Sequence, residues 1–380
     1  MLLFEIYIMK TLKILIIILA LAATSCSKKN SEPKPTNKFP DEMQAEVEKI
    51  TNNILTKNRI PGAIVGIWQD EYEPLIAACG YSNVHTSEPM KPDMHFRIGE
   101  ITRTFTATAI LQQIDDKKLD LTYKLKDFYS EFRNSDTITI KQLLNGTSGL
   151  HDFAYDTTLA HAWIKNPIRK WDMQDYIDAS LLCPPDFAPG TTFHNTDIAY
   201  NLLGMIVERL SEKKLYKYFQ KKFFDELEMK NTYVSDSTGL ESPFSHGYTR
   251  NPSTGVPEEA TFINPSALWA SGSIVSNMSD LHRWIRSLGQ GTFLKPETHA
   301  AMLDFSDTKS IRCVYGLGVE KTKSLIGHSG NIQGFNTVAY YYPEKKITII
   351  VMVNLTDQFN QYAQEIAFDI INKYFPEALK

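Results

Sequence analysis

Cysteine is scarce in this sequence, with 4 residues in 380. So few thiols exclude a dense disulfide framework, and Cys79, Cys183 and Cys313 are expected to be buried thiols. The metal-ligand spacings HExxH and CxxC are missing, as is a glycine loop that could cradle a phosphate. We therefore expect no cofactor and no metal.

An excess of positive charge is also absent. The formal net charge is −4, with 40 basic and 44 acidic residues. These charges are scattered along the chain, whereas a nucleic-acid-binding protein gathers lysine and arginine to neutralise a row of phosphates. We expect no nucleic-acid partner.

The N-terminal apolar run is too short to cross a membrane as a helix. It extends from Ile14 to Ala23, follows two lysines and has about the length of a signal-peptide core. Small residues then lead to Cys26, and this arrangement resembles a bacterial lipobox, whose cysteine is lipidated. We predict a signal peptide at residues 1–26, export, and a lipid anchor to a bacterial membrane, periplasmic or at the cell surface. An ordinary signal peptide with a chance cysteine is the alternative.

A flexible tether is predicted to follow at residues 27–40. The segment is rich in Lys, Ser, Asn and Pro and has one large apolar residue, Phe39. It buries too little apolar surface to offset the entropy of ordering. The whole chain is 43% hydrophobic and 22% charged, as globular proteins are, and residues 41–380 are predicted to form one domain.

Both ends of this domain are predicted to combine helices and strands. Near the start, apolar residues at helical spacing precede two strands, and near the end two strands precede a helix. The segments are a helix through Met43, Val47, Ile50, Ile54 and Leu55, strands at Ala63–Trp68, Leu75–Cys79, Phe335–Tyr342 and Ile347–Asn354, and a helix from about Gln358 to Tyr374. Residues 100–290 are mostly helical in pattern. We therefore predict an α/β (α+β) fold, with one sheet from both chain ends and an inserted, mainly helical lobe.

A buried helix is predicted to start near Gly99. Its apolar positions cover most of its circumference, and its threonines are poor helix formers, so burial must stabilise it. Glu100 would lie at the positive end of the helix dipole, and Arg103 one turn further on the same face.

Three segments resemble the serine β-lactamases and penicillin-binding proteins. They are RIGEITRTFTA from Arg97, PGTTFHNTDIAYNLLG from Pro189 and GHSGNIQGF from Gly327. With weaker similarities elsewhere, the resemblance covers nearly all of residues 41–356. It implies the β-lactamase-like fold, in which an antiparallel sheet is flanked by helices.

The resemblance also identifies two replaced catalytic residues. It places Glu100 at the nucleophilic serine and Arg103 at the lysine, which that family uses because a neutral lysine can accept the serine proton. A guanidinium has a pKa above about 12 and does not give up its proton in a protein. Arg103 therefore cannot be the base.

The second motif is altered and the third is intact. Where the family has tyrosine and asparagine as YxN, this sequence has Asn195, which cannot act as a general acid or base, and Asp197, which adds negative charge. The HxG motif is His328 to Gly330; in relatives it forms a pocket wall, and the next backbone N–H helps to bind the oxyanion. No catalytic residue is assigned, and the candidate binding residues are Glu100, Arg103, Asn195, Asp197, His328, Gly330 and Asn331.

Three functional hypotheses follow. The first is a catalytically silent lipoprotein whose pocket binds an unidentified small molecule or peptide, with weak affinity for the family's anionic substrates. The second is a hydrolase with altered chemistry, in which Glu100, Asp197 and His328 perform acid and base work or hold a metal. A simpler interpretation, which we favour over the second, is an ion pair between Glu100 and Arg103 that fixes the helix start. The third hypothesis is an active serine hydrolase that uses Ser148 or Ser329 as its nucleophile, although both serines are expected to be structural.

Overall fold

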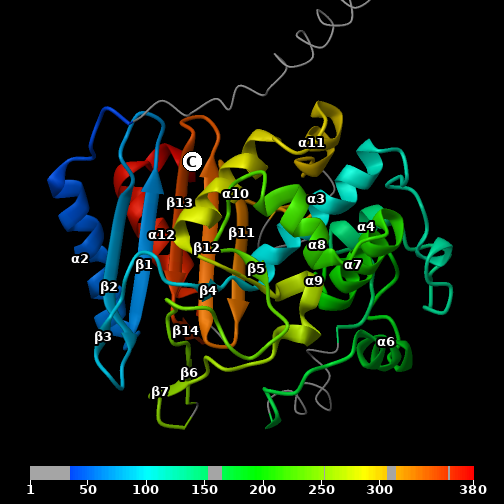
Figure 1. The fold of residues 1–380 in the computed structure, drawn as a ribbon. Helices are drawn as coiled ribbons and strands as arrows, with labels where there is room; N and C mark the ends of the chain where they lie inside the picture. Colours follow the sequence, from blue (N-terminus) through cyan, green and yellow to red (C-terminus); the bar gives the residue numbers. More distant parts are fainter. Residues whose placement is uncertain (1–34, 153–164, 252, 306–313, 358–359) are drawn as a thin grey trace, which may run out of the picture. The chain divides into compact units, whose positions relative to one another are not determined.

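Figure 1 shows a computed structural model of the chain, which describes residues 35–152, 165–251, 253–305, 314–357 and 360–380. The predicted signal peptide, Cys26 and most of the predicted tether lie outside the described residues. The chain divides into two compact units, Met1–Thr36 and Asn37–Lys380. Within the described ranges, no helix is both long and apolar enough to span a bilayer.

An eight-stranded sheet in the larger unit is built from both ends of the chain. Its order is β3-β2-β1-β13-β12-β11-β10-β9, and the N-terminal β1 pairs antiparallel with the C-terminal β13 (Figure 1). The strands are β1 Gly62–Trp68, β2 Leu75–Asn83, β3 Glu88–Pro89, β9 Val314–Tyr315, β10 Glu320–Thr322, β11 Leu325–Ile332, β12 Phe335–Tyr342 and β13 Ile347–Val353. The predicted fold class is confirmed.

Helices cover both faces of this sheet, so its central strands are apolar throughout rather than alternating. In β1, Ala63, Val65 and Ile67 belong to the core under α2 (Asp41–Asn58) and α12 (Tyr362–Tyr374). Ile64 and Trp68 point the other way, into the core shared with α3 (Thr102–Asp115) and α10 (Met278–Gln290). The predicted terminal helices and strands are present, although α12 begins at Tyr362 rather than Gln358.

The lobe inserted between the two halves of the sheet is mainly helical, as predicted (Figure 1). Its helices and turns are η1 Gly99–Ile101, η2 Leu125–Asp127, α4 Ile140–Leu144, α6 Met173–Leu182, α7 Asp197–Ser211, α8 Leu215–Phe219, the π-helical turn η4 Gln220–Phe224, η5 Pro265–Ala267, α9 Trp269–Gly272 and α11 Pro296–Met302. Two three-stranded sheets complete the described part: β14 Leu355–Thr356 with β6 Tyr248–Arg250 and β7 Pro257–Glu259, and β8 Ile274–Ser276 with β4 Phe96–Arg97 and β5 Tyr233–Val234. A short helix, η6 Pro376–Leu379, ends the chain.

The threonines of α3 are compatible with its burial because their hydroxyls bond inside the core. Thr104 Oγ1 donates to Ile101 O at 2.7 Å and accepts from the indole N–H of Trp284 at 2.7 Å. The ring of Trp284 stacks on Phe105, with centroids 3.7 Å apart. The prediction of a helix stabilised by burial is confirmed.

The cysteine predictions are only partly confirmed. Cys79 is buried in β2, and burial raises the pKa of its thiol to about 11. Cys183 is partly exposed because it follows the last residue of α6, where the chain leaves the core. Cys313 lies outside the described residues.

Candidate functional site

The start of α3 lies against strand β11 because two glycines allow the close approach. Gly99 has a φ of +53°, and a Cβ there would come within 2.9 Å of Asn331 N. A Cβ on Gly330 would lie 2.0 Å from Ile98 O. This packing places the residue after Gly99 directly beside the backbone of Asn331.

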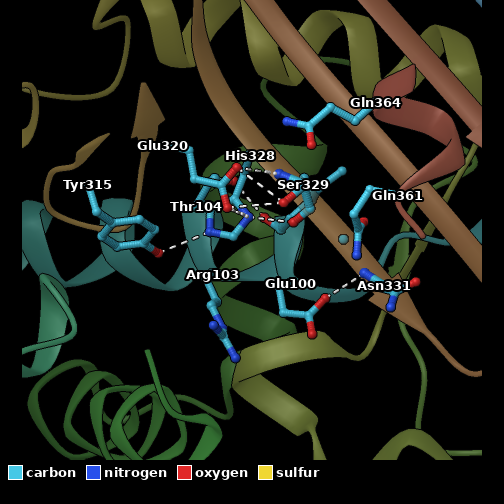
Figure 2. A network of polar contacts seen from close by, with 12 residues as sticks. Glu100, Arg103, Thr104, Tyr315, Glu320, His328, Ser329, Asn331, Gln361 and Gln364 are labelled. Atoms are coloured by element: carbon cyan, nitrogen blue, oxygen red, sulfur yellow. Dashed lines mark hydrogen bonds and ion pairs between the residues drawn. The ribbon is translucent and has the colours of Figure 1, made fainter. Parts of the chain in front are cut away.

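Glu100 uses its carboxylate to bind that backbone. Its Oε2 accepts the N–H of Asn331 at 2.7 Å (Figure 2). Burial raises the pKa of the Glu100 carboxyl, while the positive charge of Arg103 and the N–H of Asn331 act in the opposite direction. A partly buried carboxylate thus occupies the position that the resemblance assigns to the nucleophile.

Arg103 binds Asp197 and not Glu100, and Figure 2 marks no ion pair between Glu100 and Arg103. One guanidinium nitrogen lies 2.7 Å from Asp197 Oδ1, and Nε donates to Ser271 Oγ at 2.9 Å. Burial by itself lowers the pKa of Arg103, but the carboxylates of Asp197 and Glu100 outweigh it and the pKa is raised. Arg103 therefore stays protonated.

The predicted Glu100–Arg103 ion pair is wrong for a physical reason. Asp197 is the first residue of α7, and its side chain is 9% exposed, so it offers Arg103 a carboxylate partner inside the protein. A buried charge needs such a partner more than an exposed one does. Glu100, one turn earlier, accepts a hydrogen bond from the N–H of Asn331 instead.

The residues around Asp197 are buried and polar. The Asp197 N–H donates to Asp152 Oδ2 at 2.9 Å, which satisfies one free donor of the helix start. Among the described residues, Asn195 Oδ1 and Thr196 Oγ1 have no hydrogen-bond partner although both atoms are buried. Asn195 offers no acid or base in place of the family's tyrosine.

His328 is 2% exposed and belongs to a chain of neutral groups. Its Nε2 lies 3.0 Å from Tyr315 Oη, which lies 3.2 Å from Tyr200 Oη, and Tyr200 donates to Leu144 O at 2.7 Å. Burial lowers the pKa of His328, although the nearby carboxylate of Glu320 opposes this shift. The imidazole is therefore expected to be uncharged at neutral pH.

Glu320, on β10, is a site residue that the sequence did not reveal. Its carboxylate accepts the Ser329 N–H at 3.1 Å and the Ser329 hydroxyl at 3.0 Å (Figure 2). No sequence motif marks it. The other candidate nucleophile, Ser148, is 1% exposed and accepts the N–H of Leu150 within its own turn.

The structure brings most of the predicted site residues together at one place. The charges of Asp197 and Glu100 raise the pKa of Arg103, and the charge of Arg103 in turn lowers the pKa of Glu100 and of His328. Asn195 follows Phe193, whose ring contacts Tyr315. Within the described ranges, no three His, Cys, Asp or Glu side chains are placed to hold a metal ion.

A helix start packed on an HxG strand, beside a helical lobe and a sheet from both chain ends, defines the class of β-lactamase-like serine hydrolases. The family model described as Beta-lactamase matches residues 44–370. The chain belongs to the beta-lactamase family.

Solved structures share the fold of this chain. D-amino acid amidase from Ochrobactrum anthropi SV3, in complex with L-phenylalanine, superimposes with a TM-score of 0.79 and 20% identity, covering 90% of this chain and 100% of that one. A D-stereospecific amidohydrolase from Streptomyces sp. gives a TM-score of 0.78 and 22% identity, covering 88% and 99%. These likenesses show the fold.

Among curated proteins, Protein flp of Staphylococcus aureus strain N315 is 25% identical over 335 residues. The match covers 85% of this chain but only 65% of the length of that relative.

Proposed function

We propose that this protein is a non-catalytic member of the beta-lactamase family whose site binds a small molecule or a peptide. The supporting observation is the identity of the side chains at the two positions that hold the family's nucleophile and base. Position 100 carries a carboxylate bound to the Asn331 N–H, and Arg103 is held between Asp197 and Ser271. Position 100 has no hydroxyl to attack a substrate, and the guanidinium at position 103 cannot accept a proton.

Loss of the nucleophile and its base has a large effect on the rate of acyl transfer. In a serine protease, removal of the nucleophile alone costs about a million-fold in rate, and the remaining members do not compensate because they act as a unit. Asn195 also lacks the phenol of the family's YxN motif, so a third member is missing. We infer that serine acyl transfer is absent.

Labelled penicillin tests this proposal directly. The purified full chain, incubated with the label and examined by intact mass, is expected to show no added mass. An active penicillin-binding protein treated in parallel is the positive control. A stable adduct on this chain contradicts the proposal.

We further propose that the protein is exported and lipid-anchored through Cys26. The supporting observation is the sequence of residues 1–26, in which two lysines, an apolar run and small residues precede the cysteine. In a bacterial expression host, the wild-type chain should partition with membranes and Cys26→Ala should not. Equal partitioning of the two chains contradicts the anchor.

A hydrolase with altered chemistry is the second candidate, and the pair Glu100 and Glu320 favours it. Their carboxylates accept the N–H groups of Asn331 and Ser329, and these two N–H groups lie two residues, or roughly 7 Å, apart along β11. Two carboxylates in different surroundings can divide acid and base roles. Activity on an ester, peptide or glycoside panel should then vanish in Glu100→Ala and in Glu320→Ala. Activity that survives both substitutions removes this candidate.

A further inference from the structure

The edge of β11 that faces the site is closed by side chains of the same protein. β10 pairs with β11 only as far as Gly327, opposite Glu320. Beyond that point the N–H of Ser329 donates to Glu320 at 3.1 Å, and the N–H of Asn331 donates to Glu100 at 2.7 Å (Figure 2). Two carboxylates therefore continue the hydrogen bonding where a neighbouring strand has ended.

The contact at Asn331 is the more consequential of the two. The N–H that follows the HxG motif is the donor that the resemblance assigns to oxyanion binding, and here a carboxylate oxygen already accepts it. The distance of 2.7 Å is typical of a strong hydrogen bond to an ionised acceptor. A ligand oxygen can use this donor only if the carboxylate leaves.

We propose that Glu100 is a tethered occupant of the oxyanion-binding N–H of Asn331, which closes the site to ligands with an anionic oxygen until its side chain moves away. The inference rests on the proposed function, because it takes position 100 to be an acceptor rather than a nucleophile. It adds that the side chain at position 100, besides replacing the serine, occupies a donor that a ligand with an anionic oxygen would use.

The charges around Glu100 determine what its displacement requires. Arg103, on the helix that continues from Glu100, is already paired with Asp197. Among the described residues, further titratable groups of this cluster are Glu320 on β10, His328 on β11, whose pKa is lowered by burial, and Tyr200 and Tyr315 near Arg103. A carboxylate displaced by an anion would thus lie near that anion, while Arg103, the cation whose charge acts on Glu100, is already engaged by Asp197. Taking up a proton relieves this repulsion, so anion binding should be coupled to protonation of Glu100.

The experiment titrates the full chain, purified in detergent, with phenylacetate as the carboxylate probe and phenethylamine as a cationic control. Calorimetry gives the affinity, and the amide signal of Asn331 in protein labelled with ¹⁵N-asparagine reports the site. At pH 7.5, Glu100→Ala should bind phenylacetate at least about tenfold more tightly than wild type, with a shifted Asn331 signal. Phenethylamine should show no such gain.

Matched variants distinguish the effect of the Glu100–Asn331 contact from a general effect of removing negative charge. Glu320→Ala also removes a carboxylate from the edge of β11 but leaves Asn331 bonded, so it should not move the Asn331 signal on titration. Glu100→Gln keeps the size of the side chain and should give an intermediate affinity. If Glu100→Ala fails to unfold cooperatively, Glu100→Gln supplies the comparison.

The pH dependence gives a second readout. Wild-type affinity for phenylacetate should increase as the pH falls, by up to about tenfold per unit, while that of Glu100→Gln should not follow this slope. The inference is overturned if both Glu100 variants bind phenylacetate as wild type does, or if Glu320→Ala matches the gain of Glu100→Ala. These results leave the proposed function standing, whereas a penicillin adduct would overturn that function by itself.

Discussion

Arg103 and Asp197 form an ion pair whose side chains are only 8% and 9% exposed. Removing one partner of a buried pair leaves the other charge without compensation, at a cost of about 3–5 kcal/mol. We therefore expect Arg103→Met to lower the free energy of unfolding by that amount in urea denaturation. The double variant Arg103→Met, Asp197→Leu should recover much of the loss. A change below about 1 kcal/mol in the single variant contradicts the prediction.

The raised pKa of Glu100 implies a stability that depends on pH. Its ordinary value is 4.5 and burial raises it in the folded chain, so the folded state holds the proton at a pH where the unfolded state has lost it. The contribution of this group is therefore favourable in acid and is lost as the pH rises through the folded pKa. We expect Glu100→Gln to gain stability relative to wild type as the pH rises above 4.5. Parallel stability curves for the two proteins from pH 4 to 8 exclude this shift.

At the scale of residues, the sequence predicted positions better than partners. Glu100 and Arg103 were placed correctly at the start of a buried helix, but their predicted ion pair was wrong. The partner of Arg103 is 94 residues away in the chain, and that of Glu100 is 231 residues away. The second partner is a backbone N–H, which every residue except proline has, so no residue type indicates it. Glu320 was missed because its role depends on where β10 ends.

The contact between η1 and β11 depends on Gly330. A Cβ there would lie 2.0 Å from Ile98 O and 3.2 Å from Glu100 N, both backbone atoms that cannot move independently. We expect Gly330→Ala to cost about 1–3 kcal/mol of unfolding free energy, as overpacking does. Gly239→Ala is the control, because nothing lies within 4 Å of a Cβ at that position. Equal thermal midpoints for the two variants would falsify this account of the contact.

At the scale of elements, long segments with clear apolar spacing were predicted and short ones were not. The strands β1, β12 and β13 and the helices α2 and α12 were all recognised, because each buries a continuous set of apolar side chains. The two- and three-residue strands β4, β5 and β8 carry no such pattern. They exist because the buried chain around Phe96 and Ile274 needs partners for its backbone groups.

At the scale of the whole molecule, the sheet was predicted from the two ends of the chain, and its pairing confirms this. Residues Ala63 and Val353 are register partners although almost the entire lobe lies between them in sequence. Neither half of the sheet can be completed without the other. We infer that cooperative folding requires both ends to be present, because β1 and β13 come from opposite ends of the chain and pair with each other inside the sheet.

Deletion of residues 362–380 tests this requirement. It removes α12, which buries Tyr362, Ala363, Ile366, Ala367, Ile370 and Ile371 over the sheet. The uncovered face would expose a large apolar patch, so the truncated chain should lose its cooperative thermal transition and bind a hydrophobic dye. Deletion of residues 1–36, which belong to the other compact unit, should leave that transition in place. If the chain without α12 melts cooperatively near the wild-type midpoint, the C-terminal helix is dispensable and the two-ended sheet does not need it for folding.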